Sequence, residues 1–195
     1  MTSPLTPHPA GDGNVLAARQ TGARQLVAVL GGVLLVALGA QAAIPLPMTP
    51  VPLTLQGPAV LVVGALLGAR LGAASMVSYL VLGAAGLPVF APVGLPGIER
   101  LFGPTGGYLL AFPVAAALVG HFTRDQRSWI RLGAALVAGL AVIHAGGIAQ
   151  LAALGGDLGS AWKLGSAPFL IADLCKLLIA GLVIRRFGPA TRALL

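Results

Sequence analysis

Two oppositely charged residues, Asp173 and Lys176, stand in an otherwise apolar stretch near the C-terminal end, APFLIADLCKLLIAGLVIRRF (167–187). This stretch has the length and composition of a membrane-spanning helix. A charge at the centre of a bilayer costs at least about 2.5–3.5 kcal/mol on insertion scales, so such residues are commonly functional. Because the two residues are three positions apart, they share one face of a helix and can form an ion pair.

The charged pair has two interpretations. It can be a neutralising pair without a ligand, which lowers the cost of burying either charge. Since an apolar replacement of a buried pair is often as stable, we favour a role in function. A carboxylate accepts hydrogen bonds and an ammonium group donates them. Together they suit a small molecule that carries N–H donors beside a carbonyl on an apolar body, such as a cyclic urea.

The sequence does not indicate catalysis. No Ser/His/Asp set in an apolar stretch, HExxH zinc motif or phosphate-binding glycine loop accompanies the charged pair. The single cysteine, Cys175, excludes an intrachain disulfide and a multi-cysteine metal site. We therefore predict that the chain is not an enzyme and that it needs no cofactor.

The composition is that of an integral membrane protein. Hydrophobic residues make up 57% of the 195 residues and charged residues 9%, whereas soluble domains carry about 25% charged residues. Such a chain cannot cover a water-exposed surface, so the lipid bilayer must be its solvent. The net charge of +7 does not indicate nucleic acid, because the basic residues are scattered between apolar runs.

Six apolar runs predict an all-α membrane protein with six transmembrane helices in a compact bundle. We expect residues 1–25 to be a flexible cytoplasmic tail, residues 26–187 the membrane domain and residues 188–195 a second cytoplasmic tail. The apolar runs are 26–44, 57–68, 71–87, 108–122, 132–154 and 167–184. The second run is only about 18 Å long as a helix, so either the preceding connector dips into the membrane or neighbouring helices shield this run.

Three connecting segments are expected to lack helices. The segment PLPMTPVPLTLQ (45–56) contains four prolines, which predict a rigid, extended connector. The segment 88–107 is a long Pro/Gly loop, and long loops without a helix are often functional. A Gly-rich loop with Asp157 and Lys163 follows the fifth run.

The distribution of basic residues supports six spans with both termini in the cytoplasm. Under this topology only Arg100 and Lys163 lie outside, and Lys176 lies within a span. This asymmetry follows the positive-inside rule. The basic residues that lie inside are Arg19, Arg24, Arg70, Arg124, Arg127, Arg131, Arg185, Arg186 and Arg192.

Other polar residues in the apolar runs are open to two interpretations. We interpret His144 as a packed, hydrogen-bonded histidine rather than a metal ligand, because no second His or Cys is close in sequence. Gln150 either faces the same cavity as the charged pair or bonds between helices. Tyr79 and Tyr108 are either interfacial anchors or pocket walls.

Small residues are spaced four apart in the first run, where Ala28 precedes Gly32 and Gly39 precedes Ala43. Such pairs allow close approach of helices. They either pack within the bundle or form a docking face for a partner membrane protein.

Four motifs occur in an order and spacing that resemble a known family. They are VPLTLQ (51–56), GLPVF (86–90), GPTGGY (103–108) and D-x-x-K (173–176). Each motif alone is weak, but four in sequence are specific. On these motifs, residues 25–187 resemble BioY, the biotin-binding S component of energy-coupling factor (ECF) transporters.

The resemblance implies a six-helix bundle with a biotin pocket near the outer face, covered by the connector 45–56 as a lid. It implies that Asp173 and Lys176 contact the biotin head group. Asp173 is expected to accept from the ureido N–H groups. Lys176 is expected to donate either to the ureido carbonyl or to Asp173 itself.

The resemblance also implies four further contacts with biotin. Phe90 and Tyr108 are expected to pack against the apolar thioether ring. Thr54 and Gln56 are expected to bond its polar edges. The alternative role of these four residues is to make the loops rigid.

The implied function is high-affinity capture of biotin for uptake at the bacterial plasma membrane. Because the chain has no nucleotide-binding motif, the implied partners are an ECF transmembrane coupling protein and a pair of cytoplasmic ATPases. A second possibility is that the protein operates as a homo-oligomer, without a coupling protein and ATPase pair of its own. The alternative is a proton-coupled or stand-alone carrier for biotin or another small vitamin, with Asp173 as a proton relay.

Overall fold

The computed structural model describes residues 12–123 and 128–194. Within these residues the chain is helical, and the only β-type pairing is an isolated antiparallel bridge between Ile44 and Leu53. The all-α prediction therefore agrees with the structure. The described helices are α1 (Asp12–Gln41), α2 (Gln56–Ala84), α3 (Glu99–Phe102), α4 (Gly106–Phe122), α5 (Trp129–Gly155), α6 (Leu158–Gly165) and α7 (Leu170–Leu194).

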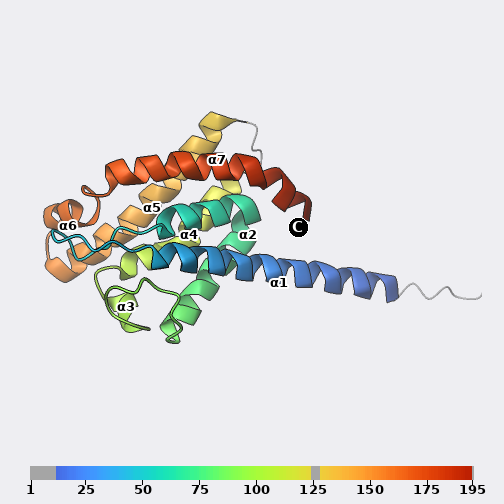
Figure 1. Cartoon of the computed structure of the whole chain (residues 1–195), viewed down its shortest axis with the longest axis horizontal. Coiled ribbons are helices and arrows are strands. Elements are labelled where there is room, and N and C mark those ends of the chain that lie inside the picture. The colour runs from blue at the N-terminus through green and yellow to red at the C-terminus, as the bar shows by residue number, and fades with distance from the viewer. Residues whose placement is uncertain (1–11, 124–127, 195) are drawn as a thin grey trace, which may run out of the picture.

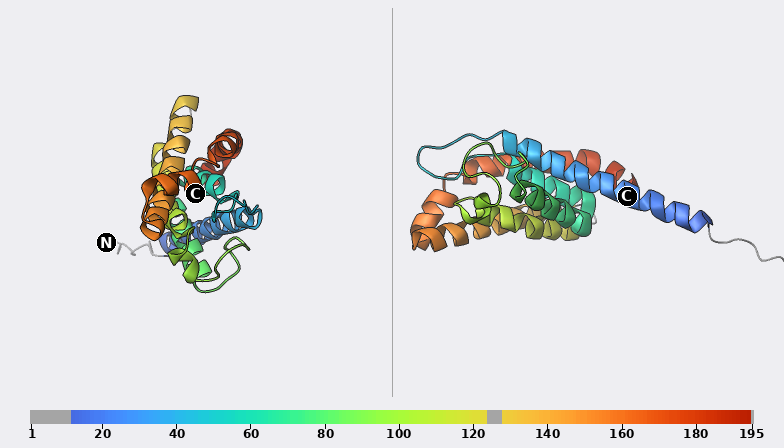
Figure 2. Two further views of the ribbon diagram at one scale, coloured as in Figure 1. Left: turned by 90° about the vertical axis from the view of Figure 1, so that its left-hand side faces the viewer. Right: turned by 90° about the horizontal axis from the view of Figure 1, so that it is seen from below.

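The two ends of the helical bundle are different (Figures 1 and 2). The start of α1 and the end of α7 lie at one end. The connector between α1 and α2, together with α3 and α6, lies at the opposite end. This arrangement agrees with the expectation that both termini are on one side, although the compartment that they face stays a prediction.

Helix α2 contains a break that the sequence analysis interpreted as a boundary between two spans. Gly68 has φ 79° and ψ 176°, which is not helical. Positive φ is accessible to glycine because it lacks a Cβ atom. The break lies between the second and third predicted runs, which are therefore two separate helical limbs that share the label Gln56–Ala84.

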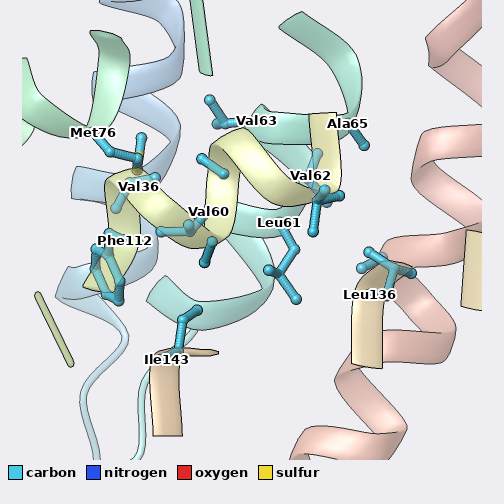
Figure 3. Packing of buried hydrophobic residues seen from close by; sticks show 14 of the residues in the cluster. Val36, Val60, Leu61, Val62, Val63, Ala65, Met76, Phe112, Leu136 and Ile143 are labelled. Atoms are coloured by element: carbon cyan, nitrogen blue, oxygen red, sulfur yellow. The ribbon is translucent and has the colours of Figure 1, made fainter. Parts of the chain in front are cut away.

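The first limb of α2 is at the centre of the hydrophobic core. Figure 3 shows Val60 on the side of Val36, Met76 and Phe112, whereas Leu61 points toward Ile143 and Leu136 of α5. Val60 and Leu61 are fully buried. Of the two explanations for the short second run, shielding by neighbouring helices is therefore the one that the structure supports.

Several described helices are suited to a membrane. By length and composition, the candidates within the described residues are Gln20–Gln41, Gln56–Ala84 and Trp129–Gly155. The helices Leu158–Gly165 and Leu170–Thr191, bent by 53°, would make a fourth span if they cross together. Large apolar side chains on the outer faces of these helices are exposed, as a lipid-facing surface requires. The count of six spans stays a prediction.

The connecting segments are more ordered than expected. The connector is not extended: it folds back on itself, and Ile44 and Leu53 exchange backbone N–H···O bonds of 2.8 and 2.9 Å. The segment 88–107 contains α3. The Gly-rich segment after the fifth run contains α6, which Asp157 caps by accepting from the Gly159 and Ser160 amides. A carboxylate is a preferred residue at this position.

The helices also extend beyond the expected membrane domain. Helix α1 begins at Asp12, inside the stretch expected to be a flexible tail. Helix α7 continues to Leu194 and so includes most of the expected C-terminal tail. Residues 1–11 lie outside the described part of the chain. The division into tails and membrane domain stays a prediction.

The small residues of α1 pack within the bundle. A Cβ atom on Gly32 would collide with Ser75 and Val63 of α2, and one on Gly39 would collide with the backbone of Leu55. The structure therefore supports internal packing at these two positions, rather than a face left free for a partner.

Candidate binding site

A cavity lies between the connector and helices α2, α3, α4, α5 and α7. It leaves about 90 Å³ for the centres of water molecules, and one water molecule needs about 10–15 Å³ by this measure. The cavity can therefore hold a small organic group. All six residues singled out from the sequence line it, namely Thr54, Gln56, Phe90, Tyr108, Asp173 and Lys176.

Asp173, which the sequence places near the middle of the last apolar run, lies in the first turn of α7. The chain turns at residues 166–169 and α7 begins at Leu170. Pro168 in this turn favours a break, because proline cannot donate to a preceding helical turn. The partial positive charge at the start of a helix stabilises a carboxylate there.

The predicted ion pair is present. Asp173 Oδ1 and Lys176 Nζ are 3.0 Å apart, and their side chains are 12% and 14% exposed. Lys176 also donates to the carbonyl oxygen of Thr54 at 2.9 Å. An ammonium group has three donors, so two of them are used here and one remains. Lys176 thus links α7 to the connector and keeps a donor for a ligand.

His144 completes the surroundings of the carboxylate from α5. Its Nε2 atom is 3.0 Å from Asp173 Oδ2, and its Nδ1 atom is 2.7 Å from Ser166 Oγ. This agrees with the interpretation of His144 as a hydrogen-bonded histidine. In the described part of the chain, no cluster of His, Cys, Asp and Glu could hold a metal ion.

Thr54 and Gln56 are engaged with the protein itself. Thr54 Oγ1 accepts from the Gln56 amide at 3.3 Å. The Gln56 side chain donates to the Tyr79 hydroxyl at 2.8 Å, which donates in turn to the carbonyl of Val89 at 2.9 Å. Tyr79 is fully buried and does not line the cavity, so it is neither an interfacial anchor nor a pocket wall. These bonds support a role in loop rigidity for Gln56.

Tyr108 is a wall of the cavity, as one of its two interpretations expected. Its hydroxyl donates to the carbonyl of Gly165 at 2.6 Å. Its ring meets the His144 ring edge-on, with centroids 6.2 Å apart. The ring also lies against Gly147, where a Cβ atom would collide with it. Tyr108 therefore joins α4 to α5 and α6 beside the charged pair.

Arg100 is a cavity residue that the sequence analysis missed, because it counted Arg100 only as an outside loop charge. Arg100 is 5% exposed, and it donates to the carbonyls of Leu95 at 2.6 Å and Ala91 at 2.7 Å. Its guanidinium lies 5.9 Å from the centroid of the Phe90 ring. Burial lowers the pKa of Arg100, but a guanidinium group stays protonated in proteins.

Gln150 does not line the cavity. Its side chain donates to the carbonyls of Leu101 at 3.0 Å and Gly103 at 2.6 Å. It therefore fixes α3 and the start of the segment after it to α5. Of its two interpretations, a bond between helices is supported, because Leu101 lies in α3 and Gln150 in α5.

The charges of the cavity wall define what it can bind. Asp173 is the only acid among the lining residues, and Lys176 and Arg100 are the Lys and Arg side chains among them. With His144 neutral, the wall carries a net charge of +1. The wall can accept from N–H groups, donate to a carbonyl and attract one negative charge.

The comparisons with known proteins agree with the resemblance found in the motifs. A model of the BioY family matches residues 13–193. The biotin transporter BioY of Thermotoga maritima is 39% identical over 163 residues, which are 84% of this chain and 95% of the relative. The probable biotin transporter BioY of Pyrococcus horikoshii is 40% identical over 159 residues, which are 82% and 93% of the two chains.

The fold also matches a solved structure. The S-component for biotin from an ECF-type ABC transporter superposes with a TM-score of 0.74, over 91% of this chain and 94% of that chain. At 24% identity this likeness shows the fold alone. Together with the family model and the sequence relatives, these findings show that the chain belongs to the BioY family.

Proposed function

We propose that this chain binds biotin and mediates its uptake through the cell membrane as the S component of an ECF-type transporter. The observation that carries this proposal is the cavity in which Asp173, Lys176 and Arg100 converge. The relatives are named as transporters of biotin, and the protein is a multi-pass membrane protein rather than an enzyme.

The chemistry of biotin fits the groups of the cavity wall. Its cyclic urea offers N–H donors to Asp173 and a carbonyl acceptor to Lys176. Its thioether ring is apolar and suits the rings of Phe90 and Tyr108. Its carboxylate carries one negative charge, which balances the net charge of +1 and is suited to Arg100, because guanidinium binds carboxylates through paired donors.

The proposal includes a topology and partners. We propose six spans with both termini in the cytoplasm, so that the connector, α3 and α6 face outward. Energy would come from a separate coupling protein and ATPase pair, since the sequence holds no phosphate-binding glycine loop. The inward packing of Gly32 and Gly39 directs the search for a docking face to other positions of α1.

Calorimetry of the purified protein tests the proposal. We expect saturable binding of one biotin per chain. Desthiobiotin, which keeps the urea and lacks the sulfur ring, should bind more weakly but measurably. No saturable binding, or undiminished binding by both Asp173→Asn and Lys176→Ala, would contradict the proposed function.

A proton-coupled carrier is the alternative function. The observation in its favour is the chain of hydrogen bonds from Asp173 through His144 to Ser166, since such groups can pass protons. Ser166 is fully buried, so this series of hydrogen bonds does not lead to water at Ser166. Uptake into vesicles that lack any ATPase, driven by a proton gradient, would favour this alternative.

A further inference from the structure

We infer that His144 is a positioning residue of the binding site. In the tautomer with the proton on Nε2, which Asp173 selects and Ser166 accommodates, it donates to Asp173 and keeps that carboxylate fixed toward the cavity. The consequence for biotin rests on the proposed function. The tautomer itself is a property of the protein without a ligand and does not rest on it.

Three elements meet at the His144 ring. His144 lies on α5, Asp173 lies in the first turn of α7, and Ser166 follows the end of α6. Both ring nitrogens are used, Nε2 toward Asp173 at 3.0 Å and Nδ1 toward Ser166 at 2.7 Å. The edge contact with Tyr108 holds the ring from α4. These three contacts fix the position and the plane of the imidazole ring.

The hydrogen-bond network determines where the proton lies. An ionised carboxylate can only accept, so Nε2 must donate to Asp173 Oδ2. A bare nitrogen facing that oxygen at 3.0 Å would place two lone pairs against each other. The Ser166 hydroxyl can donate or accept, and it therefore adapts by donating to Nδ1.

Ser166 is well placed to accommodate this tautomer. It is fully buried, and its amide donates to the carbonyl of Trp162 at 3.0 Å. Its own carbonyl accepts from the Phe169 amide at 2.9 Å. Both backbone groups are thus committed, and the hydroxyl stays beside Nδ1.

The balance of charge favours a neutral imidazole. The charged side chains of the cavity wall are Asp173 and Lys176 from α7 and Arg100 from α3. Asp173 is already neutralised by Lys176. A charged His144 would be a third cation in a wall with one carboxylate, which a buried site does not favour.

The consequence is a carboxylate that is prepared for a ligand. Lys176 occupies one lone pair of Oδ1 and His144 one lone pair of Oδ2, and a carboxylate has about four such sites. The remaining sites can accept ureido N–H groups. Because the carboxylate is already ordered, binding does not have to order it, which improves affinity.

Two variants that each reproduce the place of one ring nitrogen test the positioning role. The amide nitrogen of His144→Gln reaches the place of Nε2 and can donate to Asp173, whereas that of His144→Asn reaches only the place of Nδ1. We expect His144→Gln to bind biotin within about threefold of the wild type and His144→Asn to lose about tenfold or more. Biotin and desthiobiotin should weaken by the same factor, since both keep the urea. Equal losses in the two variants, or losses that differ between the two ligands, would overturn the inference.

Nitrogen NMR of histidine-labelled protein tests the tautomer without any ligand or variant. We expect the His144 signals to show a protonated Nε2 and an unprotonated Nδ1. The Ser166→Ala variant should keep the proton on Nε2, because Asp173 is still its acceptor, whereas Asp173→Asn should allow exchange between tautomers. A proton on Nδ1, or a doubly protonated ring at neutral pH, would overturn the inference. If the wild type bound no biotin, the proposed function would fail, and this spectrum would still decide the tautomer.

Discussion

The cavity holds two buried cations that the protein treats in opposite ways. Lys176 is paired with a carboxylate of the same helix at 3.0 Å. Arg100 has no acid beside it in the cavity wall and is held by two carbonyl oxygens and an aromatic ring. Carbonyl dipoles stabilise a cation but do not cancel its charge. The difference indicates that the corner of the cavity around Asp173 and Lys176 is suited to a neutral polar group, and the corner around Arg100 to an anion.

The largest expected effect comes from removing the carboxylate beside Lys176, so that Lys176, like Arg100, has no acid beside it. Asp173→Asn removes the counterion of Lys176 and replaces one of the two acceptor oxygens with a donor, so either Lys176 or His144 loses its partner. We expect biotin binding to weaken by at least about 2 kcal/mol, because a buried donor is left unpaired. Thermal unfolding of the purified variant should also occur at a lower temperature, because breaking a buried ion pair is destabilising.

A double variant separates stability from binding. Asp173→Leu combined with Lys176→Met removes both charges and replaces them with apolar side chains. We expect the unfolding temperature to rise above that of Asp173→Asn, since apolar replacement of a buried pair is often neutral. It should stay below that of the wild type, because His144 and the Thr54 carbonyl lose their partners. Binding should not return. A double variant that binds biotin like the wild type would show that this corner does not recognise the ligand.

The second prediction concerns the corner around Arg100. In the wild type, biotin should bind more tightly than its neutral amide, because the carboxylate meets an uncompensated cation. Arg100→Gln should weaken biotin by about tenfold or more, as expected for loss of a charge-assisted hydrogen bond, and should leave the amide nearly unchanged. Competition binding with both ligands measures the ratio. A ratio that persists in the variant would place the carboxylate elsewhere.

The sequence predicted the corner of the charged pair better than the corner of Arg100. A charge inside an apolar run is conspicuous, so Asp173 and Lys176 were found from their surroundings alone. Arg100 lies in a Pro/Gly loop, where an arginine is normally solvated. Its burial depends on how the loop folds back around Phe90, which no local pattern reveals.

Long-range partners were also beyond the sequence. His144 meets Asp173 from 29 positions away, and Gln150 meets Gly103 from 47 positions away. Helix α6 was missed although signals for it were present, namely Asp157 as a cap and Lys163 in the last turn. The apolar runs located the long helices, because segments that face lipid must be hydrophobic. They did not set the helix ends, since α1 and α7 extend beyond their runs.

The third prediction concerns two glycines, each of which packs against an aromatic ring of the cavity wall. A Cβ atom on Gly147 would collide with the Tyr108 ring, and one on Gly83 would collide with the Phe90 ring. Such overpacking costs about 1–3 kcal/mol. We expect Gly147→Ala to weaken biotin and its amide equally, and Gly83→Ala to weaken biotin more than the amide.

A third glycine provides the control for these variants. Gly133 lies on α5, as Gly147 does, and a Cβ atom there would meet nothing within 4 Å. Gly133→Ala should therefore leave binding unchanged and should raise the unfolding temperature slightly, because alanine favours the helix by about 0.5–1 kcal/mol. A similar loss of binding in all three variants would argue against specific displacement of the two rings.

The smallest expected effect concerns the connector that adjoins both corners. Thr49 Oγ1 donates to the carbonyl of Leu164 at 2.7 Å and accepts from the Val51 amide at 3.1 Å. Thr49→Val removes both bonds, and we expect the connector to open more easily by about 1 kcal/mol. Biotin should dissociate severalfold faster in a chase experiment, and Thr49→Ser should restore the wild-type rate. An unchanged rate in Thr49→Val would show that this bond does not hold the connector closed.

A structure of the protein with biotin bound tests the central claim most directly. We predict that a ureido nitrogen lies within hydrogen-bonding distance of Asp173 and that the remaining donor of Lys176 meets the ureido oxygen. The carboxylate of biotin should lie beside Arg100. Biotin bound outside this cavity, or with its urea turned away from Asp173, would contradict this claim.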